Sequence, residues 1–200
     1  MVTALYLAHL NPVTTAHTQI IEELINDADK VMVLPVIFRD GQREINSKSF
    51  PFNFELRKKM LESIFDKKIK ISDGYCFYAP FKKYMPPLLS PKSWQLRKQI
   101  LKDVNDEYFS YTGDKAEGYM LKLYRLKPKI GERKILSASS VKEKLYDSVK
   151  TSNSNWKDDV PTQVAKIIDD NWEIVEKFAN SEDLTTRVAG MKFPKEGWSK

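Results

Sequence analysis

The sequence predicts an α/β fold: a Rossmann-like open parallel sheet of about five strands flanked by helices, with a C-terminal helical extension. The apolar run at residues 2–8 is followed by apolar residues at helical spacing in 20–25 and by a second apolar run at 30–36. Strand, helix and strand within about 36 residues form a βαβ unit, whose crossover is right-handed in nearly all proteins. Strand-like and helix-like segments then alternate up to about residue 150.

The later elements follow from local patterns. Residues 54–65 carry apolar side chains on one helical face, and residues 68–72 alternate as a strand does. The polar residues 38–53 are expected to form an irregular loop beside the ligand site. The other expected features are an unassigned aromatic and proline-rich segment at 74–90, a helix around Trp94 capped by Ser90 or Ser93, a fourth strand at 108–113, a short amphipathic segment at 119–126, and a fifth strand at 134–137.

Two units are expected along the chain. Residues 1–150 form the Rossmann-like domain, and residues 151–200 form a C-terminal helical extension and tail packed on the same domain. The end of the tail carries Met191, Phe193 and Trp198, so it is too apolar for a linker. It is expected to dock on its own domain or on a neighbouring subunit, which leaves a homo-oligomer open.

Composition limits the class of protein. With 42% hydrophobic and 30% charged residues, the chain can bury a core and remain soluble. No apolar run approaches the roughly 20 residues that span a bilayer, and the N-terminus lacks a basic lead, so a cytoplasmic protein without membrane contact is expected. The single cysteine, Cys76, excludes an internal disulfide. The net charge of +6 favours anionic ligands, but the lysines are spread along the sequence, so nucleic acid is not the expected partner.

The stretch from Ala4 to His17, ALYLAHLNPVTTAH, combines a strand, a tight loop and the start of a helix. Amide groups at a helix start lack intrahelical partners, and the helix dipole adds positive charge, so a phosphate binds well there. Thr14 or Thr15 could cap the helix, and His17 in its first turn could point toward the same anion. An ordinary capped βα unit explains these residues equally well.

Residues 136–143, LSASSVKE, form a second stretch of this kind, with a strand end, a serine-rich turn and a helix start. Ser140 and Glu143 have the spacing of a capping box. The serine hydroxyls and Lys142 could hold another phosphate. Taken alone, an ordinary capped helix is the favoured explanation.

Together the two stretches resemble the signatures of the HIGH-type nucleotidyltransferase superfamily. LNPVTTAH resembles the first signature, (H/T)-x-G-H after a proline-containing loop, as found in nicotinamide-mononucleotide and phosphopantetheine adenylyltransferases. Residues 136–143 resemble the second, I-S-S-T-x-x-R in the former enzymes and S-S-S-x-V-K-E in the latter. The stretch at 160–167 is similar to the helix that ends many members. Ala8 and Ala16 depart from the pattern, because most members have glycine there.

The resemblance implies an enzyme that transfers a nucleoside monophosphate, preferably AMP from ATP, to a phosphorylated small-molecule acceptor and releases pyrophosphate. It implies that His17, Thr14 and Lys142 are catalytic and that the acceptor phosphate is itself the nucleophile. Mg²⁺ is expected on the triphosphate, without a metal cage of side chains. The expected nucleotide contacts are Ala8, His9, Leu10, Asn11, Asp114, Ser137, Ser139 and Ser140, and the expected acceptor contacts are Arg39, Trp94 and Arg97.

Alternatives stay open at this stage. An activity like that of nicotinamide-mononucleotide adenylyltransferase is narrowly preferred over a phosphopantetheine adenylyltransferase or a cytidylyltransferase. The substitutions at Ala8, Ala16 and Lys142 also allow a non-catalytic nucleotide-binding sensor or scaffold. Charge alone suggests a third class, an RNA-binding α/β protein.

Overall fold

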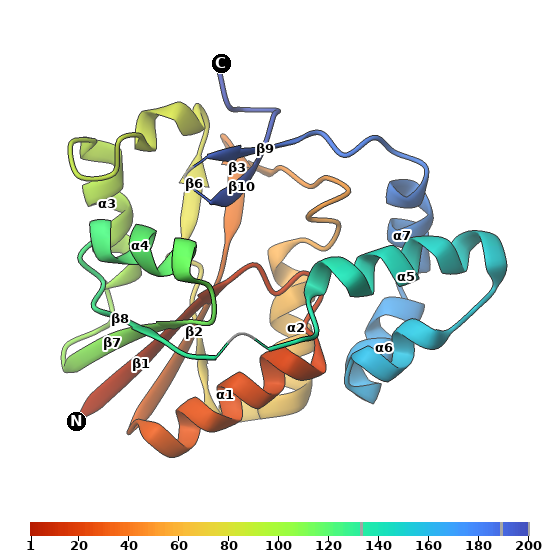
Figure 1. Cartoon of the computed structure of the whole chain (residues 1–200), viewed down its shortest axis with the longest axis horizontal. Helices are drawn as coiled ribbons and strands as arrows, with labels where there is room; N and C mark the ends of the chain where they lie inside the picture. The colour runs from red at the N-terminus through yellow and green to blue at the C-terminus, as the bar shows by residue number, and fades with distance from the viewer. Residues whose placement is uncertain (133, 189, 200) are drawn as a thin grey trace.

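The computed structural model describes residues 1–132, 134–188 and 190–199. At its centre lies a five-stranded parallel sheet in the order β5-β2-β1-β7-β8 (Figure 1). Its strands are β1 (Val2–Ala8), β2 (Lys30–Pro35), β5 (Lys70–Ile71), β7 (Glu107–Thr112) and β8 (Pro128–Ile130). The predicted Rossmann-like sheet is confirmed. The order reverses its direction between β1 and β7, and open α/β sheets bind ligands at the carboxyl ends of the strands on either side of such a point.

Side chains of β1 alternate between two hydrophobic cores, one on each face of the sheet. Ala4 and Tyr6 pack with α1 and α2, whereas Leu5 and Leu7 pack with α3 and α4. Each of these fully buried leucines contributes roughly 1.5–3 kcal/mol to folding. Figure 1 shows the two pairs of helices on opposite sides of the sheet. Their bounds are α1 Thr15–Asp27, α2 Phe54–Phe65, α3 Pro91–Ile100 and α4 Lys115–Leu123.

The C-terminal part of the chain consists of helices and a hairpin, and the hairpin was not predicted. Helix α7 packs against α5, and α6 packs against α2. Met191 and Phe193 are buried in the core that contains Leu5 and Leu7, so the tail docks on its own chain. No helix in the described residues is long and apolar enough to cross a bilayer. The elements are α5 (Ala138–Thr151), α6 (Thr162–Asp169), α7 (Trp172–Ala179), and the antiparallel strands β9 (Thr185–Val188) and β10 (Met191–Pro194).

A second small sheet follows β2, in a segment expected to be irregular. Strand β3 (Ile37–Asp40) pairs in parallel with β6 (Cys76–Tyr78) and antiparallel with β4 (Arg43–Glu44). The prediction that 38–53 is entirely a loop is therefore wrong, because β3 finds its parallel partner far along the chain and local pattern does not reveal that pairing. Short 3₁₀ helices complete the chain at η1 (Asp66–Lys68), η2 (Phe81–Tyr84) and η3 (Asn155–Asp159).

The fifth strand of the main sheet lies earlier than predicted. Residues 134–137 form no strand, and Ile135 is fully exposed. The reason is the tight turn after α4, in which the N–H of Leu126 bonds to the oxygen of Leu121 at 2.9 Å. This turn brings Pro128 directly beside Ser110 of β7 and so starts β8. Pro128 is tolerated because it opens an edge strand, where a missing N–H costs little.

Candidate active site

The two segments that carry the candidate motifs meet beyond the carboxyl end of β1. Lys142 of α5 donates hydrogen bonds from Nζ to the backbone oxygens of Asn11 at 2.9 Å and Ala138 at 3.0 Å. Lys142 and Asn11 are 131 residues apart in the sequence. Burial, together with the nearby Lys192, lowers the pKa of Lys142 to about 8. The ammonium group is therefore a buried cation with carbonyl partners, and a bound anion would stabilise it.

The start of α1 fixes the position and the tautomer of His17. Thr14 is the N-cap: its Oγ1 accepts from the N–H of His17 at 3.4 Å, and its own N–H donates to His17 Nδ1 at 3.0 Å. Burial and the nearby Lys142 lower the pKa of His17 to about 4, so the ring is neutral at pH 7. Because Nδ1 accepts, Nε2 carries the proton and is a donor. Thr14 is fully buried and positions this ring, and its contact with a triphosphate stays a prediction.

The start of α5 is exposed. Ser137 is its N-cap, with Oγ accepting from the N–H of Ser140 at 3.2 Å. The predicted capping box of Ser140 and Glu143 is wrong, because the helix begins three residues earlier and Ser140 occupies its first turn. Ser137 and Ser139 are both exposed. The first amides of a helix lack backbone partners within it, and helix starts that bind phosphate use such amides together with hydroxyls like these.

The loop between β1 and α1 is held mainly through its backbone. The side chain of Asn11 is buried and exchanges two hydrogen bonds with the backbone of Phe52, at 2.8 and 3.1 Å. Leu10 is buried in the left-handed region at φ 50°, a conformation that costs an L-residue free energy and that only a tightly packed loop maintains. Ala8 and His9 are half-buried, and the ring of His9 stacks on Phe50 with centroids 4.7 Å apart. Only these two predicted loop contacts therefore present side chains at the surface.

Asp114 lies at the carboxyl end of β7, as predicted. Its Oδ1 caps α4 by accepting from the N–H groups of Ala116 and Glu117, and the residue is exposed. It lines a hollow of about 460 Å³ between the start of α4 and the chain after β8. The neighbouring Glu117 points away from this hollow: burial raises its pKa to about 7, and Oε2 accepts from Thr112 Oγ1 at 2.6 Å.

The three predicted acceptor contacts are not brought to this cluster by any described contact. Trp94 donates from Nε1 to the oxygen of Leu88 at 3.0 Å, and its ring lies under the guanidinium of Arg125. Arg97 donates to the hydroxyl of Tyr108 at 3.2 Å. Arg39 lies on β3, and its buried Nε has no hydrogen-bond partner among the described residues. Their role in binding an acceptor stays a prediction.

Two basic residues near the cluster were not singled out by the sequence. Arg57 of α2 is buried, donates from Nη1 to the oxygen of His9 at 2.8 Å, and forms an ion pair with Glu44 at 3.1 Å. The position of Arg57 on the apolar face of the predicted helix could have indicated that its side chain is buried and paired. Lys192 of β10 is close enough to lower the pKa of both His9 and Lys142. A lone lysine in an unpredicted hairpin gave no signal.

The side chains beyond the carboxyl ends of β1 and β7 offer few ligands for a metal ion. Among the described residues, no three His, Cys, Asp or Glu side chains gather to hold a metal. Asp114 is the exposed carboxylate at the carboxyl end of β7, and its Oδ1 already caps α4. Mg²⁺ commonly keeps several waters and binds through phosphates with one or two carboxylates, so this donor set suits it.

Comparison with solved structures relates this geometry to known proteins. A bifunctional NMN adenylyltransferase/ADP ribose pyrophosphatase from Francisella tularensis has a TM-score of 0.63 and 17% identity, over 88% of this chain and 52% of that one. A protein from Vibrio parahaemolyticus, provisionally assigned as a nicotinate-nucleotide adenylyltransferase, has a TM-score of 0.52 and 14% identity, over 84% and 98%. NadR in complex with NR has a TM-score of 0.51 and 18% identity, over 74% and 42%.

The chain spans about half the length of the Francisella protein, so the match concerns one part of that protein. No family model matches the sequence, and no curated protein matches it. At 14–18% identity the likeness concerns the fold. The strand order and these structural neighbours agree, and the chain therefore shares the Rossmann-like fold of these solved adenylyltransferase structures.

Proposed function

We propose that this chain is a nucleotidyltransferase that transfers AMP from ATP to the phosphate group of a small acceptor and releases pyrophosphate. The observation that carries the proposal is the hydrogen bond between Lys142 and the oxygen of Asn11. It joins a buried cation, the exposed start of α5 and the neutral ring of His17 in one place at the end of β1. The shared fold with adenylyltransferases supports the same conclusion.

In the proposed reaction, an oxygen of the acceptor phosphate attacks the α-phosphorus of ATP. The new P–O bond forms while the bond from the α-phosphorus to the bridging oxygen breaks, and pyrophosphate leaves. His17 Nε2–H donates to a phosphate oxygen on which negative charge builds, and Lys142 with the first-turn amides of α5 holds the leaving phosphates. The acceptor is already a nucleophile, so positioning and charge stabilisation suffice.

The hollow beside Asp114 suits the nucleoside part of the substrate. It lies at the carboxyl ends of β7 and β8, one strand away from the phosphate-binding elements at β1. The carboxylate oxygen of Asp114 that does not cap α4 can accept from ribose hydroxyls. Mg²⁺ bound to the triphosphate would offset its negative charge, with phosphate oxygens and water as its main ligands.

Nicotinamide mononucleotide is the preferred acceptor, because the two strongest structural matches cited above are adenylyltransferases of nicotinamide or nicotinate nucleotides. Phosphopantetheine as acceptor, or CTP as donor, is the second candidate, since the segment around Lys142 matches the phosphopantetheine signature. Arg39, Trp94 and Arg97 remain the candidate acceptor contacts. A cytoplasmic protein working on phosphorylated metabolites is the expected setting.

The first experiment measures pyrophosphate release with Mg²⁺-ATP and nicotinamide mononucleotide, beside the His17→Ala variant. Removing the imidazole donor is expected to lower kcat/KM at least ~100-fold. Activity with phosphopantetheine or CTP alone would keep the mechanism and change the substrate. Measurable ATP binding without turnover of any acceptor would contradict the proposal and favour a nucleotide-binding sensor or scaffold.

A further inference from the structure

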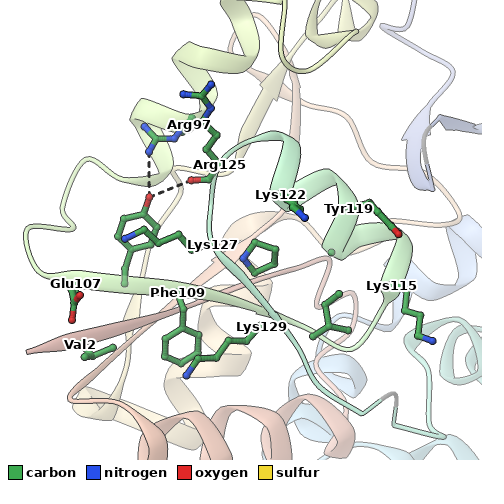
Figure 2. Close-up of a pocket in the computed structure, with 14 residues that line it drawn as sticks. Val2, Arg97, Glu107, Phe109, Lys115, Tyr119, Lys122, Arg125, Lys127 and Lys129 are labelled. Atoms are coloured by element: carbon green, nitrogen blue, oxygen red, sulfur yellow. Dashed lines mark hydrogen bonds between the residues drawn. The ribbon is translucent and has the colours of Figure 1, made fainter.

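A second, larger cavity lies along the β8 edge of the sheet, apart from Lys142 and His17. It has a volume of about 1240 Å³ and is bordered by α3, α4, β7 and β8 (Figure 2). Glu107 is the one carboxylate among its lining residues. The basic side chains that line it, here called the edge patch, are Arg97, Lys115, Lys122, Arg125, Lys127 and Lys129.

The cations of the edge patch have no acidic partner within the described part of the chain. Among the described residues, none of the six forms an ion pair. Lysines elsewhere do, as Lys70 with Asp103 at 2.8 Å and Lys144 with Asp159 at 2.6 Å. Six cations that share a cavity with one carboxylate leave a net positive charge there, which attracts a polyanion.

Aromatic rings lie among these cations. Lys129 Nζ lies 3.8 Å from the ring centroid of Phe109, and Lys127 Nζ lies 4.8 Å from that of Tyr108. Tyr119 is 71% exposed and offers an uncovered ring face at the same cavity. Figure 2 shows the basic side chains on both sides of the cavity, with Tyr119 on α4. Cations interleaved with aromatic rings are how proteins bind single strands, with the backbone on the charges and the bases on the rings.

One basic group in the patch lacks a full set of partners. Arg97 donates from one terminal nitrogen to Tyr108, whose hydroxyl donates in turn to the oxygen of Arg125 at 3.4 Å. The buried Nε of Arg97 has no partner among the described residues. The hydrogen bond to Tyr108 holds the guanidinium of Arg97 in place at the cavity, and a guanidinium positioned in this way suits a phosphate.

The shape of the cavity favours an extended ligand. Its lining runs from Val2 and Glu107, at the amino ends of β1 and β7, to Lys115, at the start of α4. The cavity therefore extends from the amino ends of β1 and β7 to the start of α4. A compact phosphate would use two or three of the six cations, whereas a polymer with regularly spaced phosphates can use them all.

We propose that the edge patch binds single-stranded nucleic acid, with its phosphates on the lysines and arginines and at least one base stacked on Tyr119. The chain places these cations on α3, α4, β8 and the turn between α4 and β8, within residues 97–129. Four of the six lie within residues 122–129, and the fold brings Arg97 and Lys115 to them. Basic residues are also spread over the rest of the chain, and for this reason the sequence alone did not favour nucleic acid as a partner.

The test uses fluorescence anisotropy with a labelled 20-nucleotide single-stranded RNA of mixed sequence and the full-length protein. The patch variant carries Lys122→Glu, Lys127→Glu and Lys129→Glu. The matched control carries Lys150→Glu, Lys166→Glu and Lys177→Glu, which are exposed lysines of the C-terminal helices and change the net charge equally. Circular dichroism and thermal unfolding verify that both variants fold, and Tyr119→Ala tests stacking separately.

The patch variant is expected to bind at least ~10-fold more weakly in 0.1 M salt than the wild type, with little change in the control. Its log–log salt slope should fall by about 2, at about 0.7 per lost phosphate contact. Tyr119→Ala should weaken binding ~5-fold or more without changing that slope. Equal losses in both charge variants, no binding by the wild type, or equal affinity for poly-glutamate or duplex RNA would each overturn the proposal.

Discussion

Helices α1 and α5 both begin with a hydroxyl N-cap, but the cap of α1 is buried and the cap of α5 is exposed to solvent. Each has a hydroxyl N-cap that accepts from a backbone N–H three residues later, Thr14 in α1 and Ser137 in α5. Thr14 is fully buried, and its partner His17 is a titratable ring held neutral by burial. Ser137 and the neighbouring Ser139 are exposed. We infer that the start of α1 orients one donor, whereas the start of α5 offers several amides and hydroxyls to an anion.

The difference teaches that two similar motifs need not have similar roles. A buried capping hydroxyl, whose hydrogen bonds are all made within the protein, acts through the group that it positions. Its removal lowers the stability of the protein and displaces that group. A hydroxyl that faces solvent acts only when a ligand arrives. Lys142 connects the two helix starts, because it belongs to α5 and donates to the loop that precedes α1.

The largest effect is expected from Lys142→Met, which keeps the length of the side chain and removes the charge. Loss of the cation at the leaving phosphates should lower kcat/KM for pyrophosphate release by at least ~100-fold. The oxygen of Asn11 loses its donor, which costs about 1–3 kcal/mol, partly offset because a buried charge is also removed.

Lys144→Met is the matched control on the same helix, since Lys144 is 41% exposed and pairs with Asp159. This change should leave kcat/KM within about twofold and stability within about 1 kcal/mol. Equal losses of activity in the two variants would show that any substitution at these positions of α5 impairs the enzyme. That result would contradict the specific role proposed for Lys142.

The second prediction concerns how the free energy of unfolding depends on pH. This dependence tests the burial of His17 at the start of α1, a property that the exposed start of α5 does not share. The pKa of His17 is lowered to about 4 and that of His9 to about 3, both mainly by burial, whereas a free histidine has about 6.5. The unfolded chain therefore binds more protons as the pH falls below 6.5, so the free energy of unfolding decreases from pH 6.5 toward pH 4. At pH 5 the loss is about 2 kcal/mol per histidine.

Urea unfolding at pH 7 and pH 5 measures this loss. The variant His9→Gln with His17→Gln should lose much of the pH dependence, while carboxylates that titrate near pH 4 remain in both proteins. A double variant with the full wild-type dependence would show that the two rings are not the cause.

The sequence predicted elements whose pattern is local and strong. The helix at 54–65 and the fourth strand near 108–113 are confirmed, since their apolar side chains face a core at helical or alternate spacing. The small sheet was missed because β3 and β6 pair although α2 and β5 separate them in the sequence. Strand β8 was missed because Pro128-Lys129-Ile130 shows neither an apolar run nor clear alternation.

The candidate site could be predicted only where its residues belong to a local sequence pattern. Each helix start has a local signature, so His17, Ser137 and Lys142 could be named from the sequence. The contact of Lys142 with Asn11 and the approach of Lys192 from the hairpin depend on tertiary packing. The alternation of polar and apolar residues carries no information about which distant cation reaches a cluster.

The smallest effects are expected from removing one hydroxyl at each helix start, the buried one by Thr14→Val and the exposed one by Ser139→Ala. Thr14→Val keeps the side-chain volume and removes the cap, so it should cost about 1 kcal/mol of stability and lower kcat through the misplaced His17. Ser139→Ala should leave stability within about 0.5 kcal/mol and raise KM for ATP about threefold, because it removes one neutral hydrogen bond to phosphate. Thermal unfolding and steady-state kinetics measure both quantities in each variant. If Ser139→Ala lost stability while Thr14→Val raised only KM, the assignment of positioning to α1 and binding to α5 would have to be exchanged.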